Sequence, residues 1–213
     1  MFILMTRILL LLFIISLSAC TSAPSRDDSL VNAQREQIWQ QRQVSLNNIE
    51  GWHIKGRMAV VNGSEYWSIN LDWQQSDDTY VIFLNGPFGA GKIKLAGSRH
   101  GVILTDGDNN MFFAKDPDTL LYEQTGVHMP VNSLRYWVLG LPEPEMVHQH
   151  FFDEQGRLGE LDRAPWQIKF KRYTNVNNLQ VPDKIFITQG EDVSVRMIIA
   201  DWQLNTRQIA KNP

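Results

Sequence analysis

Residues 52–73 read WHIKGRMAVVNGSEYWSINLDW, and this stretch decides the fold class. Apolar and polar residues alternate through most of it, as they do in a β-strand with one buried face. Asn62-Gly63 interrupts the alternation, and Asn-Gly is the dipeptide that the type I′ turn of a β-hairpin favours. The stretch therefore predicts two antiparallel strands joined by a tight turn.

The strand pattern continues along the rest of the chain. Further strand-like segments cover residues 79–85, 93–95, 102–105, 111–114, 166–170, 184–189 and 193–202. Apolar residues at helical spacing predict a helix from Ser29 to about Asn47. Asp116-Pro117 predicts the start of a short helix that ends at Gly126, and a third helix is expected from about Asn132 to Gly140.

About ten or eleven strands and three helices are too many for a simple flat sheet to bury well. The fold class that we expect is mainly β with α. It is an incomplete, unclosed antiparallel β-barrel of about 10–11 strands, with a lid of helices over its concave face.

The N-terminus has the order of a secretory signal. Arg7 precedes the apolar run of residues 8–15, and small residues lead to Cys20, the one cysteine in the sequence. The run is short for a membrane span, which needs about 20 residues. Leu17-Ser18-Ala19-Cys20 resembles a bacterial lipobox, which predicts lipid attachment at Cys20. Thr21 stands where Asp retains enteric-type lipoproteins at the inner membrane, so the outer membrane is expected.

This reading divides the chain into a signal peptide, residues 1–19, a lipidated tether, residues 20–28, and one domain, residues 29–213. The formal net charge is −3, so the sequence lacks the excess of positive charge that is typical of nucleic-acid-binding proteins. The sequence contains seven tryptophans and ten phenylalanines. Core packing explains each tryptophan singly, and a roomy apolar cavity would explain their total.

Catalytic and metal-binding patterns are weak. His148 and His150 would share one face of a strand, but two histidines without a third ligand favour a solvent-facing strand over a metal site. The sequence contains no nucleophile elbow and no H-E-x-x-H motif. We therefore expect no catalytic residues, no metal and no cofactor.

Residues 86–92, GPFGAGK, match most of a nucleotide-binding P-loop. However, Ile93 replaces the Ser or Thr that binds Mg²⁺, and the following residues alternate as a strand, whereas a P-loop leads into a helix. The segment is better interpreted as an uncharged loop with Phe88 at its tip. From composition, packing of this loop over the core is slightly favoured, and contact with a membrane is the alternative.

Several motifs together resemble the LolB family of outer-membrane lipoprotein receptors. They cover nearly the whole mature chain in the family's order. They are Trp52 to Ala59, Leu71 to Gln74, Asn85 to Gly89, Gly126 to Trp137 and Leu139 to Pro142. One position departs from the family pattern, because Phe88 stands where family members carry Leu.

The resemblance implies a receptor that is anchored in the outer membrane and faces the periplasm. It would accept lipoproteins from the periplasmic carrier LolA, hold their acyl chains in an apolar cavity and insert them into the outer membrane without ATP. It would work as a monomer. The alternative is a periplasm-facing lipoprotein that binds free lipids or acts as a structural adaptor.

The resemblance also assigns residues. Cys20 is the lipid attachment site, and Phe88 is the apolar tip that meets the bilayer, in a loop shaped by Gly86, Pro87 and Gly89. Strand phase then predicts the side chains that line the cavity: Ile54, Met58, Trp67, Ile69, Leu71, Ile93, Leu95, Ile168, Phe170 and Met197, with Leu134, Trp137 and Val138 from the lid.

Overall fold

A computed structural model describes residues 26–86, 91–146 and 148–206. The chain divides into two compact units, residues 1–34 and residues 35–213, and all the strands belong to the second unit. Cys20, Pro87, Phe88 and Gly89 lie outside the described residues. No described helix is both long and apolar enough to cross a membrane.

The described part of the chain contains three helices and eleven strands. The helices are α2 (Arg26–Asn47), α3 (Pro117–Thr125) and α4 (Val131–Trp137). The strands before α3 are β1 (Ile49–Asn62), β2 (Glu65–Ser76), β3 (Thr79–Asn85), β4 (Ile93–Ser98), β5 (Gly101–Thr105) and β6 (Met111–Ala114). Those after α4 are β7 (Gln149–Phe152), β8 (Leu158–Arg163), β9 (Trp166–Val176), β10 (Leu179–Gln189) and β11 (Val193–Thr206).

The strands form one antiparallel sheet in the order β6-β5-β4-β3-β2-β1-β11-β10-β9-β8-β7. The first and last strands pair at its centre, with Trp52 opposite Leu204 and Val60 opposite Val195. The chain thus builds one half of the sheet outward from β1 to β6. It then crosses to the far edge through α3 and α4 and builds the other half inward. Because β6 and β7 are opposite edges, the sheet is not closed, which confirms the predicted unclosed barrel.

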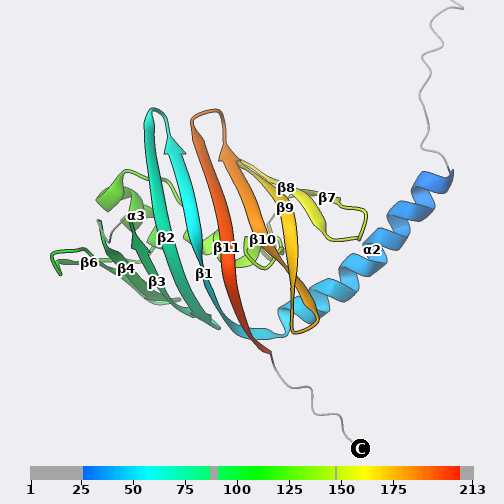
Figure 1. The fold of residues 1–213 in the computed structure, drawn as a ribbon, viewed down its shortest axis with the longest axis horizontal. Coiled ribbons are helices and arrows are strands. Elements are labelled where there is room, and N and C mark those ends of the chain that lie inside the picture. Colours follow the sequence, from blue (N-terminus) through cyan, green and yellow to red (C-terminus); the bar gives the residue numbers. More distant parts are fainter. Residues whose placement is uncertain (1–25, 87–90, 147, 207–213) are drawn as a thin grey trace, which may run out of the picture. The chain divides into compact units, whose positions relative to one another are not determined.

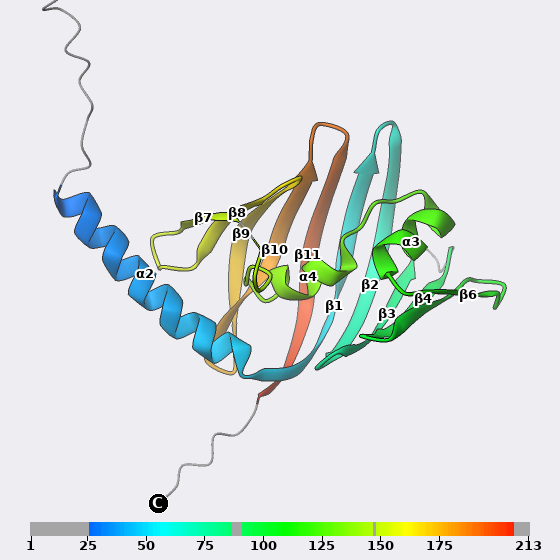
Figure 2. The ribbon, with the colours of Figure 1, turned by 180° about the vertical axis from the view of Figure 1, so that it is seen from behind.

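The sheet is curved, and α3 and α4 both lie on one face of it (Figures 1 and 2). We call this helix-covered side the inner face and the opposite side the outer face. The inner face carries most of the core. Its fully buried side chains include Ile54, Trp73, Leu95, Leu104, Ile168 and Ile185. Burial of each such side chain stabilises the fold by about 2 kcal/mol.

The capping residues Asp116 and Gly126 set the two ends of α3 as predicted. The Asp116 carboxylate accepts a hydrogen bond from the backbone N–H of Thr119 at 2.8 Å, and Pro117 occupies the first helical position. Gly126 ends the helix at φ 72°, where its N–H donates to the carbonyl of Tyr122 at 2.7 Å. A left-handed conformation at this position favours glycine over any residue with a Cβ.

Two features differ from the sequence-based expectation. The helix predicted from Ser29 begins at Arg26, and β7 and β8 form a hairpin that the apolar pattern did not delimit. In β7 the side chain of Phe151 is 54% exposed while His150 is half-buried. At this edge an apolar side chain is exposed and its polar neighbour is partly buried, the reverse of the usual pattern. A search for alternating buried apolar residues therefore misses this strand.

Gly56 is required where β1 meets β11. A Cβ at this position would overlap the carbonyl oxygen of Ile198 and approach Cα of Ile199 to 3.0 Å. The contact falls beside a register shift between β1 and β11, so the backbones are close there and cannot separate freely.

We expect Gly56→Ala to lower the free energy of unfolding by about 1–3 kcal/mol, the usual cost of forcing atoms into a packed interior. Urea denaturation followed by tryptophan fluorescence would measure it. Gly107→Ala is the control, because a Cβ there makes only ordinary contacts at 3.8 Å with Lys92. Equal stability of the two variants would contradict this account of Gly56.

Candidate functional site

A cavity of about 570 Å³ lies between the inner face of the sheet and α3. Most of its walls are apolar side chains that come from the strands on one side and from α3 and the segment after it on the other. The lining residues are Met58, Tyr66, Trp67, Ser68, Ile69, Leu84, Asn85, Gly86, Gly91, Ile93, Leu121, Thr125, Val127 and Met129.

The cavity arises because neighbouring strands differ in length. β2 pairs with β3 only from Ser76 to Asn70, where β3 ends at Asn85. Residues 65–69 of β2 extend beyond this point, and no described strand pairs with them on that side. The β1–β2 hairpin consequently projects past β3 (Figure 1). The space beside the projection is covered by α3 and is not filled by a further strand.

The structure separates the predicted cavity residues into two groups. One group lines this cavity and consists of Met58, Trp67, Ile69 and Ile93. Gly86, predicted as part of the loop, also lines it. The other nine side chains lie in the packed core with at most 7% exposure. They are Ile54, Leu71, Leu95, Leu134, Trp137, Val138, Ile168, Phe170 and Met197. Contact of either group with acyl chains stays a prediction.

Nine lining residues were missed by sequence reasoning, and the apolar Leu84, Leu121, Val127 and Met129 are among them. Leu121 was visible as an apolar residue of the predicted α3. Val127 and Met129 belong to the connection between the helices, which has no periodicity from which a side chain's direction can be inferred.

The segment that resembles a P-loop is followed by a strand. β4 begins at Ile93, directly after Lys92, and the Ile93 side chain lines the cavity. β3 ends at Asn85 and β4 begins at Ile93, so no helix N-terminus stands directly after Lys92 to hold a phosphate.

The two lid helices are joined by their first turns. The Asp118 carboxylate, in α3, accepts the backbone N–H of Val131 at 2.8 Å and thereby caps α4. Asp116 accepts the side-chain amide of Asn132 at 3.2 Å. Burial, reinforced by the charge of Asp116, raises the pKa of Asp118 from 3.8 to about 6. The helices are therefore coupled through a carboxylate whose ionised form is disfavoured.

A second contact holds the C-terminal end of α4 to the sheet. The indole N–H of Trp137 donates to the carboxylate of Glu143 at 2.8 Å, and Nε of Arg163, in β8, lies 3.1 Å from the other oxygen of that carboxylate. Glu143 is buried, so its charge needs this cation nearby. The segment that follows α4 is thus attached to the β8 side of the sheet, away from the cavity.

His150 lies in β7, and His148 directly precedes this strand. The rings of His148 and His150 are 5.5 Å apart, and Nε2 of His150 lies 3.9 Å from a carboxylate oxygen of Glu36. No group of three potential ligands gathers anywhere in the described part of the chain. These histidines instead pack with aromatic neighbours, His150 lying 4.9 Å from the ring of Phe152.

Comparison with known proteins decides the family. Residues 50–202 match the sequence model of the family described as outer membrane lipoprotein LolB. The chain belongs to the LolB family. It is 35% identical to outer-membrane lipoprotein LolB of Chromohalobacter salexigens, over 91% of this chain and 88% of that protein. It is 36% identical to LolB of Alkalilimnicola ehrlichii, over 88% of this chain and 92% of that protein.

Solved structures support the fold. A LolA superfamily protein from Nitrosomonas europaea aligns with a TM-score of 0.54 at 7% identity, covering 80% of this chain and 93% of that one. A putative outer membrane lipoprotein-sorting protein domain from Vibrio parahaemolyticus aligns with a TM-score of 0.52 at 10% identity, covering 80% and 92%. At such low identity these structures show a shared fold alone.

Family membership confirms the resemblance found in the sequence. It makes the chain an outer-membrane lipoprotein with a role in lipoprotein localisation.

The linkage at Asp118 predicts a pH dependence of stability. Because its pKa is raised on folding, folding binds a proton between about pH 4 and 6, so this group stabilises the fold as the pH falls through 6. We expect Asp118→Asn, which can still accept from Val131, to raise Tm at pH 7.5 by roughly 2–4 °C, a modest value because the group is partly solvated.

The difference in Tm between Asp118→Asn and the wild type should shrink towards zero near pH 4. Asp108→Asn, in an exposed turn, controls for loss of a negative charge. A lower Tm of Asp118→Asn at pH 7.5 would show that the capping hydrogen bond outweighs the cost of burying the charge. Differential scanning calorimetry from pH 4 to 8 measures both effects.

Proposed function

We propose that this protein receives lipoproteins from a LolA-like periplasmic carrier, holds an acyl chain in the cavity beneath α3, and passes it to the outer membrane without ATP. The observation that carries the proposal is the mainly apolar cavity between β1–β4 and α3. An empty apolar space beside an uncharged loop fits a ligand that contributes methylene groups and few hydrogen bonds.

The size of the cavity agrees with one chain. A water molecule takes about 30 Å³ of liquid, and a methylene group is of similar size, so 570 Å³ has room for roughly nineteen such groups. A lipoprotein with several acyl chains needs more space than this conformation offers. Movement of α3, which contributes Leu121 and Thr125 to one wall, would provide it.

The coupling between the helices indicates how the lid moves. Asp118 ties the first turn of α3 to α4, and Glu143 ties the end of α4 to β8. The C-terminal end of α3, which covers the cavity, is held instead by one exposed hydrogen bond, which the Asn62 side chain at the end of β1 donates to the carbonyl of Gly126 at 3.1 Å. We therefore propose that α3 swings about its first turn while α4 stays on the sheet.

Transfer without ATP requires only a gradient of affinity. Each methylene withdrawn from water contributes about 0.8 kcal/mol, so a free acyl chain does not leave a cavity for water at a useful rate. A cavity that binds the chain more tightly than the carrier does, and less tightly than the bilayer, moves it in one direction.

The remaining predictions about residues belong to the same proposal. Cys20 carries the lipid that anchors the protein after residues 1–19 are removed, and the single domain acts as a monomer facing the periplasm. Phe88 is the apolar tip that meets the bilayer, between Gly86 and Gly91, which both border the cavity. A chain leaving the cavity beside this loop would have a short path to the membrane.

Transfer from the carrier is the decisive experiment. A lipoprotein labelled on its acyl chains is loaded on the carrier and mixed with mature protein in which Cys20→Ser prevents anchoring. Movement of label to the receptor without nucleotide supports the proposal. Binding of free fatty acid without uptake from the carrier would favour a lipid-binding or adaptor protein.

Ile69→Glu tests the cavity. A charge among apolar walls disfavours acyl chains, so we expect the affinity for a fluorescent fatty acid to fall on the order of tenfold or more. Ile103→Glu is the matched control, because Ile103 is equally half-buried on a strand but does not line this cavity. Comparable affinities of the two variants would place the lipid elsewhere.

Phe88→Glu tests the loop. We expect cargo uptake from the carrier to be unchanged and insertion into liposomes to be slowed, because burial of a Phe side chain in the bilayer contributes on the order of 2 kcal/mol. The conservative variant Phe88→Leu should retain insertion. Normal insertion by Phe88→Glu would show that Phe88 has no role in the release of cargo into the membrane.

A further inference from the structure

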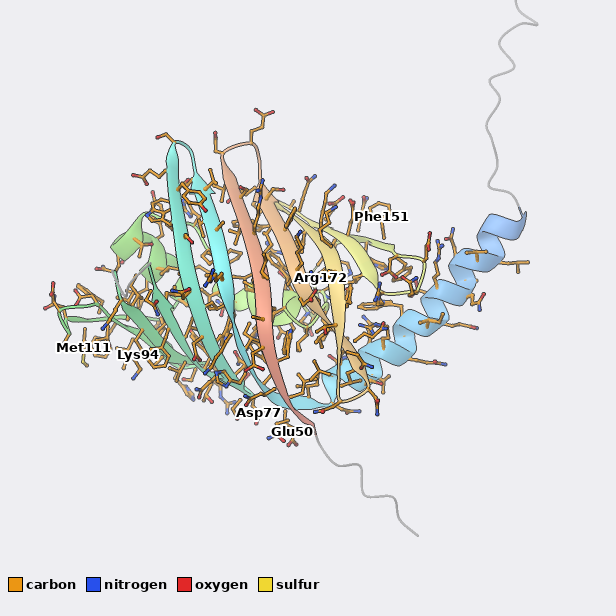
Figure 3. The ribbon with its side chains drawn as sticks, viewed as in Figure 1. Glu50, Asp77, Lys94, Met111, Phe151 and Arg172 are labelled. Carbon is orange, nitrogen blue, oxygen red and sulfur yellow. The ribbon has the colours of Figure 1, made fainter. Side chains whose placement is uncertain are left out.

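The outer face of the sheet carries a basic surface across β9, β10, β11 and β1. Cross-strand partners lie on one face of a sheet, so the register identifies two neighbouring rows of side chains. The first row is Lys169, Phe186, Arg196 and Ala59, and the second is Arg172, Lys184, Ile198 and Arg57. We call these eight residues the basic face, and Arg172 on it is labelled in Figure 3.

Two of the five cations on this face are paired. Lys169 lies 3.3 Å from Glu160, and Arg172 lies 2.8 Å from Asp183. In the part of the chain that the structure describes, no carboxylate oxygen comes within 4.0 Å of Arg57, Lys184 or Arg196. An excess of positive charge therefore gathers on one face of a chain whose net charge is −3.

Apolar groups lie among the free cations. Lys184 Nζ and Arg196 Cζ lie 5.4 and 5.6 Å from the centre of the Phe186 ring. Ile198, between Lys184 and Arg57 in its row, is 47% exposed. Long cationic side chains beside exposed apolar groups suit the headgroup region of a bilayer, where the charges meet phosphates and the apolar groups meet the upper acyl carbons.

We propose that the basic face docks on anionic phospholipid of the membrane that anchors the protein. The length of the tether favours this occupant. With Cys20 lipidated as proposed above, six residues to Arg26 span at most about 20 Å, and residues 26–34 of α2 add about 14 Å. Residue 35 thus stays within about 35 Å of the bilayer, which keeps the lipid at high effective concentration.

This docking sets the orientation in which cargo arrives. The cavity lies on the inner face, under α3, and the basic face is on the opposite side of the sheet. Figures 1 and 2 show that α3 lies on only one side of the sheet. With the basic face on lipid, the cavity faces the periplasm, where a carrier approaches. Attraction to phosphates is weakened by salt, so docking is reversible and leaves the domain free to turn when it releases its cargo.

Vesicle binding tests the proposal without cargo or carrier. The mature chain with Cys20→Ser is sedimented with vesicles of phosphatidylethanolamine that contain about 30% anionic phosphatidylglycerol, which attracts basic surfaces. The control vesicles contain phosphatidylcholine, which has no net charge, in place of phosphatidylglycerol. We expect binding to the anionic vesicles only, and a loss of that binding as salt is raised.

The variants localise the contact. Lys184→Gln with Arg196→Gln should weaken binding to anionic vesicles on the order of tenfold. Arg99→Gln with Lys115→Gln removes the same charge from exposed positions outside the basic face and should leave binding unchanged. Circular dichroism and fatty-acid affinity of both double variants establish that fold and cavity are intact.

The outcomes separate this proposal from the proposed function. Binding that ignores phosphatidylglycerol, or that falls equally in both double variants, overturns docking by the basic face and leaves cargo transfer untouched. Failure to bind any vesicle also overturns it, and capture of an acidic protein by the basic face would then indicate a protein partner in place of the membrane. Anionic binding that only the Lys184/Arg196 variant loses supports it, even if the carrier assay fails.

Discussion

The antiparallel pairing of β1 with β11 is the interaction on which the rest of the structure depends. These strands come from opposite ends of the domain and meet at the centre of the sheet, from Trp52–Leu204 to Asn62–Val193. The β1–β6 half and the β7–β11 half share their main contact there. Since this pairing must bring distant parts of the chain together, its loop-closure entropy is high, and it is expected to form late in folding.

The open sheet leaves room for the cavity. A closed barrel of this size would leave its inner face to be filled by strand side chains alone, whereas this sheet leaves β6 and β7 apart and covers its inner face with α3 and α4. Most of that interface is packed solid, with Trp137 and Ile168 fully buried. The cavity remains only where β3 ends before β2, under the end of α3.

The two faces of the sheet differ in their chemistry, and this difference organises the proposed cycle. The inner face offers an apolar space to an acyl chain, and the outer face offers free cations to phosphates. The C-terminal end of α4 is attached to β8 through Glu143 and Arg163, and the far end of α3 is linked to β1 by one hydrogen bond, from Asn62 to the carbonyl of Gly126. In the proposed swing of α3, the part of the lid that moves is the part that covers the cavity.

The sequence by itself determined the class of fold, the family and the limits of α3. Alternation from Trp52 to Trp73, the Asn62-Gly63 turn and the Asp116-Pro117 cap are local signals, and local physics decides them. The tertiary structure decided which inward-facing residues border empty space. Strand phase places Ile54 and Ile69 on the same inner face, yet Ile54 is fully buried and Ile69 lines the cavity, because packing depends on where α3 and the end of β3 lie. The basic face likewise required the register of four strands, since its residues are spread from Arg57 to Ile198 in the chain.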